Sequence, residues 1–219
     1  MKLLLPALFA ATFTVHAALD WPQFRGPTGD GHSPAKNLPV TWDTEKNVAW
    51  KTELPGKGWS SPALWHGKLY LTTADEAGAN LALRVLCRDA ATGKALWDTE
   101  VFTTPPVRHH QKNSQASPTA IVDSDRIYVH FGHYGTACLD LAGKIIWKQT
   151  ELKYSPVHGN GGSPILVGDA LIFSADGASD PSVIALDKAT GKVLWKVKRE
   201  TTAKRNFSFS TPTLITVNG

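Results

Sequence analysis

Cysteine is nearly absent from this sequence, which has Cys87 and Cys138 as its only 2 cysteines among 219 residues. Two cysteines form at most one disulfide, so a fold that depends on a disulfide framework is excluded. Long apolar runs are also absent after residue 17. Since a transmembrane helix needs about 20 apolar residues in a row, we expect no membrane span.

A strong excess of charge of one sign is missing too. Lys and Arg number 23 against 19 Asp and Glu, for a net charge of +4, and the basic residues are scattered along the chain. Nucleic-acid binding needs clustered Lys and Arg to neutralise phosphates. We therefore expect no nucleic-acid partner.

The first residues have the pattern of a secretory signal peptide. Lys2 precedes an apolar stretch over residues 3–15, and Ala17 provides a small residue at a cleavage position. We predict a signal peptide over residues 1–17, a leader segment over 18–46, and an exported protein, periplasmic or secreted.

The main positive feature is an internal repeat. Four tryptophans, Trp50, Trp97, Trp147 and Trp195, are 47, 50 and 48 residues apart. A similar turn precedes each of the last three, with these Asp and Gly residues: Asp89 and Gly93, Asp140 and Gly143, Asp187 and Gly191. A Ser/Thr-Pro pair opens each unit, at Ser61-Pro62, Ser117-Pro118, Ser163-Pro164 and Thr211-Pro212. A repeat of about this length is typical of β-propellers.

Each unit contains four short apolar, β-branched runs separated by turn residues, which predicts strands rather than helices. The predicted fold is an all-β propeller of four-stranded antiparallel blades over residues 47–219. Blades are expected at about 55–101, 114–150 and 161–199, with the start of a fourth at 208–219. With one extra strand at each end, the ring would be incomplete, so we expect a fragment whose C-terminal blades are missing.

The repeated turn has a structural explanation. The Asp carboxylate can accept hydrogen bonds from the backbone N–H groups that follow, and Gly adopts a positive φ at no steric cost. The Trp then lies on the outermost strand, where its ring can pack against the next blade. We therefore predict structural roles for the repeated Asp, Gly and Trp residues.

The two cysteines occupy the same position of successive repeats, two residues before Asp89 and Asp140. Equivalent positions of stacked sheets are separated by about 10 Å, whereas a disulfide requires Cα atoms within about 7 Å. We expect no disulfide between them.

The segment 185–195, with its Asp-Lys-Ala-Thr-Gly-Lys turn and Trp195, resembles the repeat of the quinoprotein, or PQQ-like, β-propeller family. The resemblance extends over roughly residues 47–219. The opening segment 20–31 is also similar to the leader of exported bacterial PQQ-like proteins of mostly unassigned activity. The resemblance implies the propeller fold, and the family includes both dehydrogenases and a non-enzymatic assembly scaffold.

The resemblance implies PQQ and calcium as cofactors for the dehydrogenase members, which carry a disulfide between adjacent cysteines and an acidic calcium ligand. This sequence has no Cys-Cys pair, and no position matches the calcium carboxylate. The residues present therefore do not support PQQ with calcium.

The loops that enter the first strand of each blade gather at one mouth of a propeller channel. These loops are rich in basic and imidazole groups and contain no carboxylate, which favours an anionic ligand. The candidate ligand-binding residues are Lys57, Arg108, His109, Lys112, Asn113, His158, Asn160 and Arg205. Because no metal-binding spacing connects His109, His110 and His158, we predict no metal site.

Two functions remain open from the sequence. The first is an exported, non-catalytic binding or scaffold module for a small anionic ligand, a glycan or a protein partner. The alternative is a PQQ- and calcium-dependent dehydrogenase that oxidises alcohols or sugars. No catalytic residue is predicted.

Overall fold

The computed structural model describes residues 19–105, 108–177 and 180–218. The predicted signal peptide over residues 1–17 lies outside these ranges. Within them, no helix has both the length and the apolar character needed to cross a membrane.

The structure is all-β, as predicted, and consists of three four-stranded antiparallel sheets. The first sheet has the order β1-β2-β3-β4 and comprises β1 (Ala63–Trp65), β2 (Lys68–Ala77), β3 (Asn80–Asp89) and β4 (Ala95–Thr104). The second comprises β5 (Ile121–Asp123), β6 (Arg126–His130), the 3₁₀ turn η1 (Gly132–Tyr134), β7 (Thr136–Asp140) and β8 (Ile145–Gln149). The third comprises β9 (Ile165–Val167), β10 (Ala170–Ala175), β11 (Ser182–Asp187) and β12 (Val193–Lys198).

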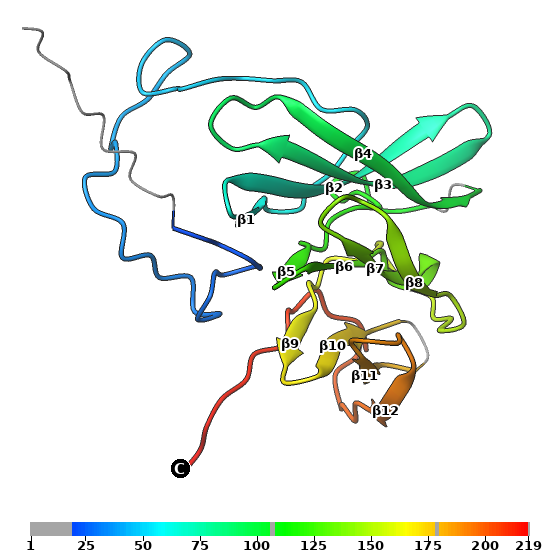
Figure 1. The fold of residues 1–219 in the computed structure, drawn as a ribbon. Helices are drawn as coiled ribbons and strands as arrows, with labels where there is room; N and C mark the ends of the chain where they lie inside the picture. The colour runs from blue at the N-terminus through cyan, green and yellow to red at the C-terminus, as the bar shows by residue number, and fades with distance from the viewer. Residues whose placement is uncertain (1–18, 106–107, 178–179, 219) are drawn as a thin grey trace, which may run out of the picture.

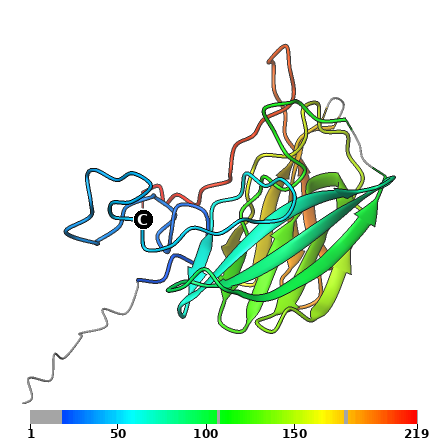
Figure 2. The same cartoon turned by 90° about the horizontal axis from the view of Figure 1, so that it is seen from above.

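The three sheets are stacked side by side as the blades of a partial propeller (Figure 1). The short first strands β1, β5 and β9 lie on the side of the leader, and the fourth strands β4, β8 and β12 lie on the opposite side (Figure 1). Figure 2 shows the same stack from above, with the leader beside the blades. Consecutive strands of each sheet pair antiparallel in chain order, so each blade is a meander.

The repeated tryptophans join neighbouring blades in the same way. The indole Nε1 of Trp50, Trp97 and Trp147 donates to a backbone oxygen in the β3–β4, β7–β8 and β11–β12 turns, respectively, each time over 3.0 Å. The rings cover Gly93, Gly143 and Gly191, all at positive φ, and an added Cβ at each would lie within 2.4–2.9 Å of the indole. The structure therefore places the repeated Trp and Gly residues at the contacts between blades.

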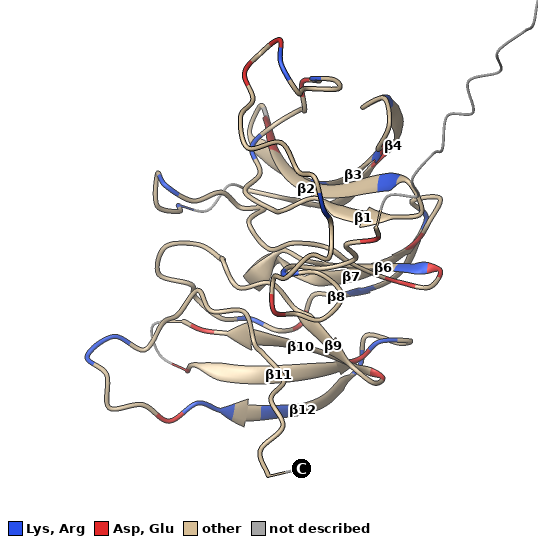
Figure 3. Ribbon diagram, turned by 90° about the vertical axis from the view of Figure 1, so that its left-hand side faces the viewer, with Lys and Arg blue, Asp and Glu red and all other residues tan. Residues whose placement is uncertain are grey.

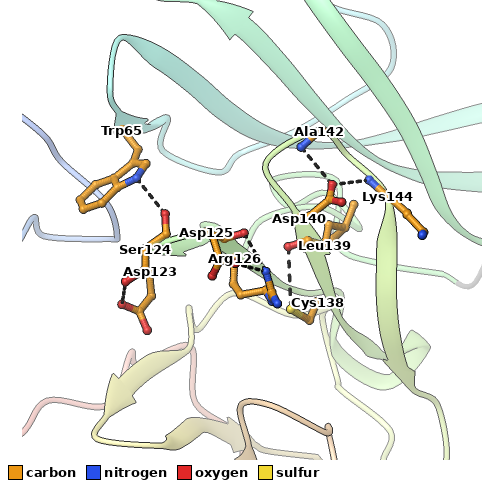
Figure 4. Close-up of polar contacts among 10 residues, drawn as sticks. All are labelled: Trp65, Asp123, Ser124, Asp125, Arg126, Cys138, Leu139, Asp140, Ala142 and Lys144. Carbon is orange, nitrogen blue, oxygen red and sulfur yellow. Dashed lines mark hydrogen bonds and ion pairs between the residues drawn. The ribbon is translucent and has the colours of Figure 1, made fainter.

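The repeated aspartates organise the turns. Oδ1 of Asp140 accepts hydrogen bonds from the backbone N–H groups of Ala142 and Lys144, both at 2.9 Å (Figure 4). Asp89 and Asp187 accept instead from the hydroxyl and the N–H of Thr92 and Thr190. The Thr hydroxyls, with the backbone N–H donors, hold the pKa of both carboxyls below the usual range. These bonds stabilise the turn locally.

Burial of the core follows the repeat as well. Tyr70, Cys87 and Trp97 are cross-strand neighbours in the first blade, and Tyr128, Cys138 and Trp147 are their counterparts in the second. Both cysteines are free and buried, and they belong to different core clusters. Burial raises the pKa of the Cys87 thiol to about 11 and that of Cys138 to about 12. Ala185 pairs with Trp195 at the same position of the third blade.

Two details of the sequence-based prediction need correction. The expected extra strands at 47–54 and 208–218 are not formed, because neither segment pairs with another strand among the described residues. Trp50 nevertheless occupies its place against Gly93. The Ser117-Pro118 pair also does not correspond to the other Ser/Thr-Pro pairs. It lies two residues too early, since Ser61, Thr119 and Ser163 each stand two residues before the first strand of their blade.

Charged side chains are dispersed over the blades. Figure 3 shows Lys and Arg interspersed with Asp and Glu along loops and strands. Several form ion pairs within one blade, such as Arg84 with Asp98 and Glu100 on β3 and β4. Arg126 similarly pairs with the adjacent Asp125 (Figure 4). This arrangement is that of a mixed, solvated surface.

Candidate functional site

A pocket of about 480 Å³ lies where the loops that enter β1, β5 and β9 meet. Its walls combine aromatic, basic, imidazole and hydroxyl side chains. We call it the mouth pocket, and its lining residues are Phe24, Trp59, Ser61, His110, Lys112, Asn113, Ser117, Thr119, His158, Gly161, Ser163 and Phe209.

A belt of hydrogen bonds connects the blades at the base of this pocket. The backbone N–H of Ser61 donates to Thr119 Oγ1, that of Thr119 to Ser163 Oγ, and that of Ser163 to Thr211 Oγ1, each at 3.0 Å. Each bond joins the residue before one inner strand to the equivalent residue of the next blade. A side-chain hydroxyl must be present at this position to accept each bond, which explains why Ser and Thr recur there.

Two loops from neighbouring blades form the basic wall. The amide of Asn113 donates to the backbone oxygens of His158 and Asn160, at 3.0 and 3.1 Å. The N–H of His110 also donates to the His158 oxygen, at 3.2 Å. Gly159 fits under Asn113, since an added Cβ would lie 2.9 Å from its amide nitrogen. These contacts fix the loop before β5 against the loop before β9.

The imidazole of His110 has a defined hydrogen-bonding role. The backbone N–H of Lys112 donates to its Nδ1 over 3.1 Å. In the neutral ring the proton must then reside on Nε2, which makes that atom a hydrogen-bond donor. His110 and Lys112 therefore both bring donors to the pocket.

Aromatic rings gather around His158. Its ring makes edge contacts with His110 and Phe207, at 5.3 and 5.2 Å between centroids, and stacks with Phe209 at 6.4 Å. Trp59 and Phe209 line the pocket with 60% and 47% of their surface exposed. Exposed aromatic faces beside polar groups are a common feature of ligand-binding surfaces.

A buried polar network supports the loop of His158 from behind. His130 at the end of β6 bonds through Nδ1 to Thr136 Oγ1 at 2.8 Å, and through Nε2 to the Tyr154 hydroxyl at 3.2 Å. That hydroxyl also donates to Asn160 Oδ1 at 3.1 Å. Burial, with a smaller contribution from the charge of His133, lowers the pKa of His130 to about 3. His130 is therefore neutral and acts as part of the scaffold of the loop.

The predicted ligand-binding residues fall into three groups in the structure. Lys112, Asn113 and His158 line the mouth pocket. Asn160 and His109 bond instead to protein groups, Asn160 to the His130 network and His109 Nδ1 to the Gln115 amide at 3.0 Å. The others lie away from the pocket lining: Lys57, which pairs through its backbone with Ala74, and the exposed Arg108 and Arg205.

Sequence reasoning missed most of the apolar and hydroxyl part of the pocket. The Trp59 ring lies in a loop selected for its lysine, and the hydroxyls of Ser61 and Ser163 were read only as landmarks. Phe24 comes from the leader, whose sequence gives no signal of proximity to the blades. Phe209 falls in the segment 208–219, which was predicted as the start of a fourth blade, so its ring was not considered as part of the site.

The described lining residues do not fit PQQ with calcium. Calcium takes six to eight oxygen ligands, among which carboxylates provide the charge. The lining described above offers hydroxyls and an amide but no Asp or Glu. No group of three or more His, Cys, Asp or Glu residues suited to a metal ion occurs within the described part of the chain.

Two acidic residues between β10 and β11, Asp176 and Asp180, are paired with basic side chains outside the mouth pocket. Asp176 is buried and accepts from Arg199 Nε at 3.2 Å, and Arg199 also donates to the Asn206 backbone oxygen at 3.0 Å. Asp180 pairs with Lys196 at 2.8 Å, and the bonded ammonium lowers the pKa of the Asp180 carboxyl. Their charges are thus compensated outside the mouth pocket.

Comparison with protein families gives one match. The family model described as outer membrane protein assembly factor BamB matches residues 35–151 and again residues 83–218. The two matches overlap and begin 48 residues apart, at residues 35 and 83, which agrees with the repeat. No curated protein matches the chain.

Solved structures with the same fold include two alcohol dehydrogenases. A quinohemoprotein alcohol dehydrogenase from Pseudomonas putida HK5 is 18% identical with a TM-score of 0.60, over 82% of this chain and 26% of its own. The enzyme from Comamonas testosteroni is 19% identical with a TM-score of 0.59, over 84% and 28%. BamB from Moraxella catarrhalis is 18% identical with a TM-score of 0.44, over 74% and 55%. The chain thus spans about a quarter of the length of these dehydrogenases, and at such identities the likeness concerns the fold alone.

Proposed function

We propose that this chain, which belongs to the PQQ-like repeat family described as outer membrane protein assembly factor BamB, is an exported binding module. Its ligand is a small anion with an apolar face, held in the mouth pocket. The description of the family, an assembly factor, supports a non-catalytic role.

The observation that carries this proposal is the composition of the mouth pocket. Lys112, His110 and His158 bring cationic or donor groups to one side, and the described lining has no carboxylate to oppose them. Hydrogen bonds to an ionised acceptor are stronger than those between neutral groups. The pocket therefore favours an anion over a neutral ligand of the same shape.

The aromatic side of the pocket adds a second preference. Trp59 and Phe209 are large rings whose faces are partly exposed at the pocket, so covering them with a ligand removes apolar surface from water. Such burial contributes about 25 cal/mol per Å². A ligand with an apolar ring next to its charge satisfies both sides of the pocket.

Benzoate and its neutral isostere benzamide test the proposal in titration calorimetry with the full chain. We expect benzoate to bind at least about tenfold more tightly, because only it can form charge-assisted hydrogen bonds. Lys112→Ala should remove this preference. Lys94→Ala, which deletes the same charge from the exposed β3–β4 turn, is the matched control and should retain it. Equal affinities for the two probes, or equal effects of the two substitutions, would contradict the proposal.

A further inference from the structure

The first part of the leader segment, residues 20–31, is attached to the inner edges of two successive blades. Trp21 forms an antiparallel bridge with Leu64 of β1, with N···O distances of 2.8 and 2.9 Å. The next residue, Pro22, accepts a hydrogen bond from the N–H of Val122 in β5 at 2.8 Å. The leader thus satisfies backbone groups that the first strands present toward the channel, and Figure 1 shows it running up to β1 and β5.

The leader is also folded on itself. Gly26 packs under the Trp21 ring, where an added Cβ would lie 2.7 Å from three ring carbons. Gln23 closes the turn, since its backbone oxygen accepts from the Gly26 N–H and its side-chain amide donates to the Gly26 oxygen, both at 3.0 Å. The Gly31 N–H donates to the Arg25 oxygen at 2.9 Å. The segment therefore has a defined shape rather than that of an extended linker.

Further contacts fix this shape across the channel. The Asp20 carboxylate accepts from the His66 N–H in the β1–β2 turn at 2.7 Å. A second pocket, of about 220 Å³, lies on the side of β9. It is lined by Gln23, Phe24 and Arg25 of the leader together with Ile165 and Leu166 of β9. The leader is therefore hydrogen-bonded to the inner strands of the first two blades, and it lines a pocket together with residues of β9 in the third.

Phe24 connects the leader to the candidate site, since its ring lines both this second pocket and the mouth pocket. The Arg25 guanidinium lies over the same ring at 5.4 Å from its centroid. The leader thus contributes one aromatic ring, that of Phe24, to a pocket whose other lining residues come from the blades and their loops.

We propose that the leader is a fixed plug that closes the channel behind the mouth pocket, and that Phe24 limits the size of the ligand. The plug follows from the backbone pairing, whereas the role of Phe24 rests on the proposed function. A ligand enters from the mouth and stops against the Phe24 ring.

Hydrogen exchange tests the plug without any ligand. In the full chain, the amides of Leu64 and Val122 should exchange slowly because they donate to Trp21 and Pro22. Gly26→Ala should accelerate both at least about tenfold, because its Cβ would collide with the Trp21 ring that holds the turn. Gly29→Ala is the matched control, with φ +72 against +75 at Gly26 but no atom within 4 Å of its Cβ.

Asp20→Ala provides a second variant outside the packed turn, and it should accelerate the Leu64 amide by removing the anchor at His66. Rapid exchange of both amides in the unaltered chain would overturn the plug. Equal exchange in Gly26→Ala, Asp20→Ala and the Gly29→Ala control would overturn it as well.

The role of Phe24 is tested with two aromatic carboxylates, benzoate and the larger 2-naphthoate. Phe24→Ala should shift the ratio of their dissociation constants at least about tenfold toward 2-naphthoate, since removal of the ring opens the back of the pocket. An unchanged ratio would refute the size limit. If the unaltered chain binds neither probe, the proposed function fails together with the role of Phe24, while the plug is still decided by hydrogen exchange.

Discussion

Individual side chains in this protein show how burial controls ionisation. His130 is almost fully buried, with its ring 4.1 Å from that of Phe173 on β10 and hydrogen bonds to Thr136 and Tyr154. The pKa of the nearby His133 is also lowered, by burial and by the charge of Lys153. The His130 ring is therefore uncharged at neutral pH in the folded protein, whereas unfolding returns it to water.

This burial predicts an acid-sensitive stability. The pKa of His130 is about 3 in the folded state against 6.5 for an ordinary histidine. The unfolded chain therefore binds more protons between these values, and stability is retained above pH 6.5 and lost as the pH falls toward 3. His130 alone should lower the free energy of unfolding by about 2 kcal/mol between pH 7 and pH 5.

Urea unfolding of the full chain at pH 7 and pH 5 measures this loss. His130→Gln retains a polar side chain but cannot take up the proton, so the loss should shrink by about the same 2 kcal/mol. His32→Gln alters an exposed histidine of the N-terminal segment and serves as the control. An unchanged pH dependence in His130→Gln would contradict the assignment.

At the level of strands and turns, each blade is tied to the next by one repeated contact. The indoles of Trp97 on β4 and Trp147 on β8 each cover a turn glycine of the following blade, and their N–H groups donate to a carbonyl of the same turn. Trp50, which lies on no strand, makes the same contact with the β3–β4 turn. A second donor two residues later strengthens the contact, from Thr99 to the Gly143 oxygen at 2.9 Å and from Gln149 to the Gly191 oxygen at 3.2 Å. Each turn is therefore bonded to the neighbouring strand through both its glycine and its carbonyl oxygens.

Gly143→Ala should weaken this contact. Its φ of +86 is unfavourable for alanine, and the added Cβ would lie 2.8 Å from Thr99 Oγ1 and 2.9 Å from the Trp97 ring. We expect a loss of about 2–4 kcal/mol in the free energy of unfolding, from backbone strain and overpacking together.

Gly67→Ala is the matched control, because Gly67 also has a positive φ, +73, but no atom lies within 4 Å of its added Cβ. Only the strain of about 1 kcal/mol should appear there. Chemical denaturation of both variants separates the two effects, and equal losses would show that the indole contact contributes nothing.

At the scale of the whole molecule, the outer face of the third blade, on β12, carries the same side chains but no partner among the described residues. Trp195 and Val197 of β12 correspond to Trp97 and Thr99 of β4, yet they remain 40% and 58% exposed. Within the described residues, no turn glycine lies beneath the Trp195 ring. This face therefore presents apolar side chains that the other blades bury against a neighbour.

We expect the chain to associate through this face. Its sedimentation coefficient should rise with protein concentration, because pairing of two such faces removes apolar surface from water. The double substitution Trp195→Lys and Val197→Lys should reduce this rise. Leu96→Lys on β4, at a side chain that is 45% exposed, is the control and should not. A sedimentation coefficient independent of concentration in the unaltered chain would contradict the expectation.

Much of the fold could be predicted because the repeat is a local signal. The Asp, Thr and Gly residues of the turns bond within about five residues of one another, and the tryptophans follow at a constant distance. The period alone therefore indicated four-stranded blades and the structural roles of Trp97, Asp89 and Gly93. The second blade shows the limit of the sequence-based prediction. Its Ser117-Pro118 pair was assigned to the position before the first strand, which Thr119 occupies in the structure.

The candidate site depended on the tertiary structure, because its residues come from parts of the chain that share no local pattern. His110 and His158 meet because the Asn113 amide and the His110 N–H both donate to the loop of His158. Lys57 and Arg205 have the same chemistry in similar loops, but they do not line the pocket. The sequence by itself determined the blades and their turns, because the turns rest on short-range hydrogen bonds and the tryptophans recur with a regular period. Only the tertiary structure decided which loop side chains converge and that Phe24 of the leader lines the mouth pocket, because these contacts join residues far apart in the chain.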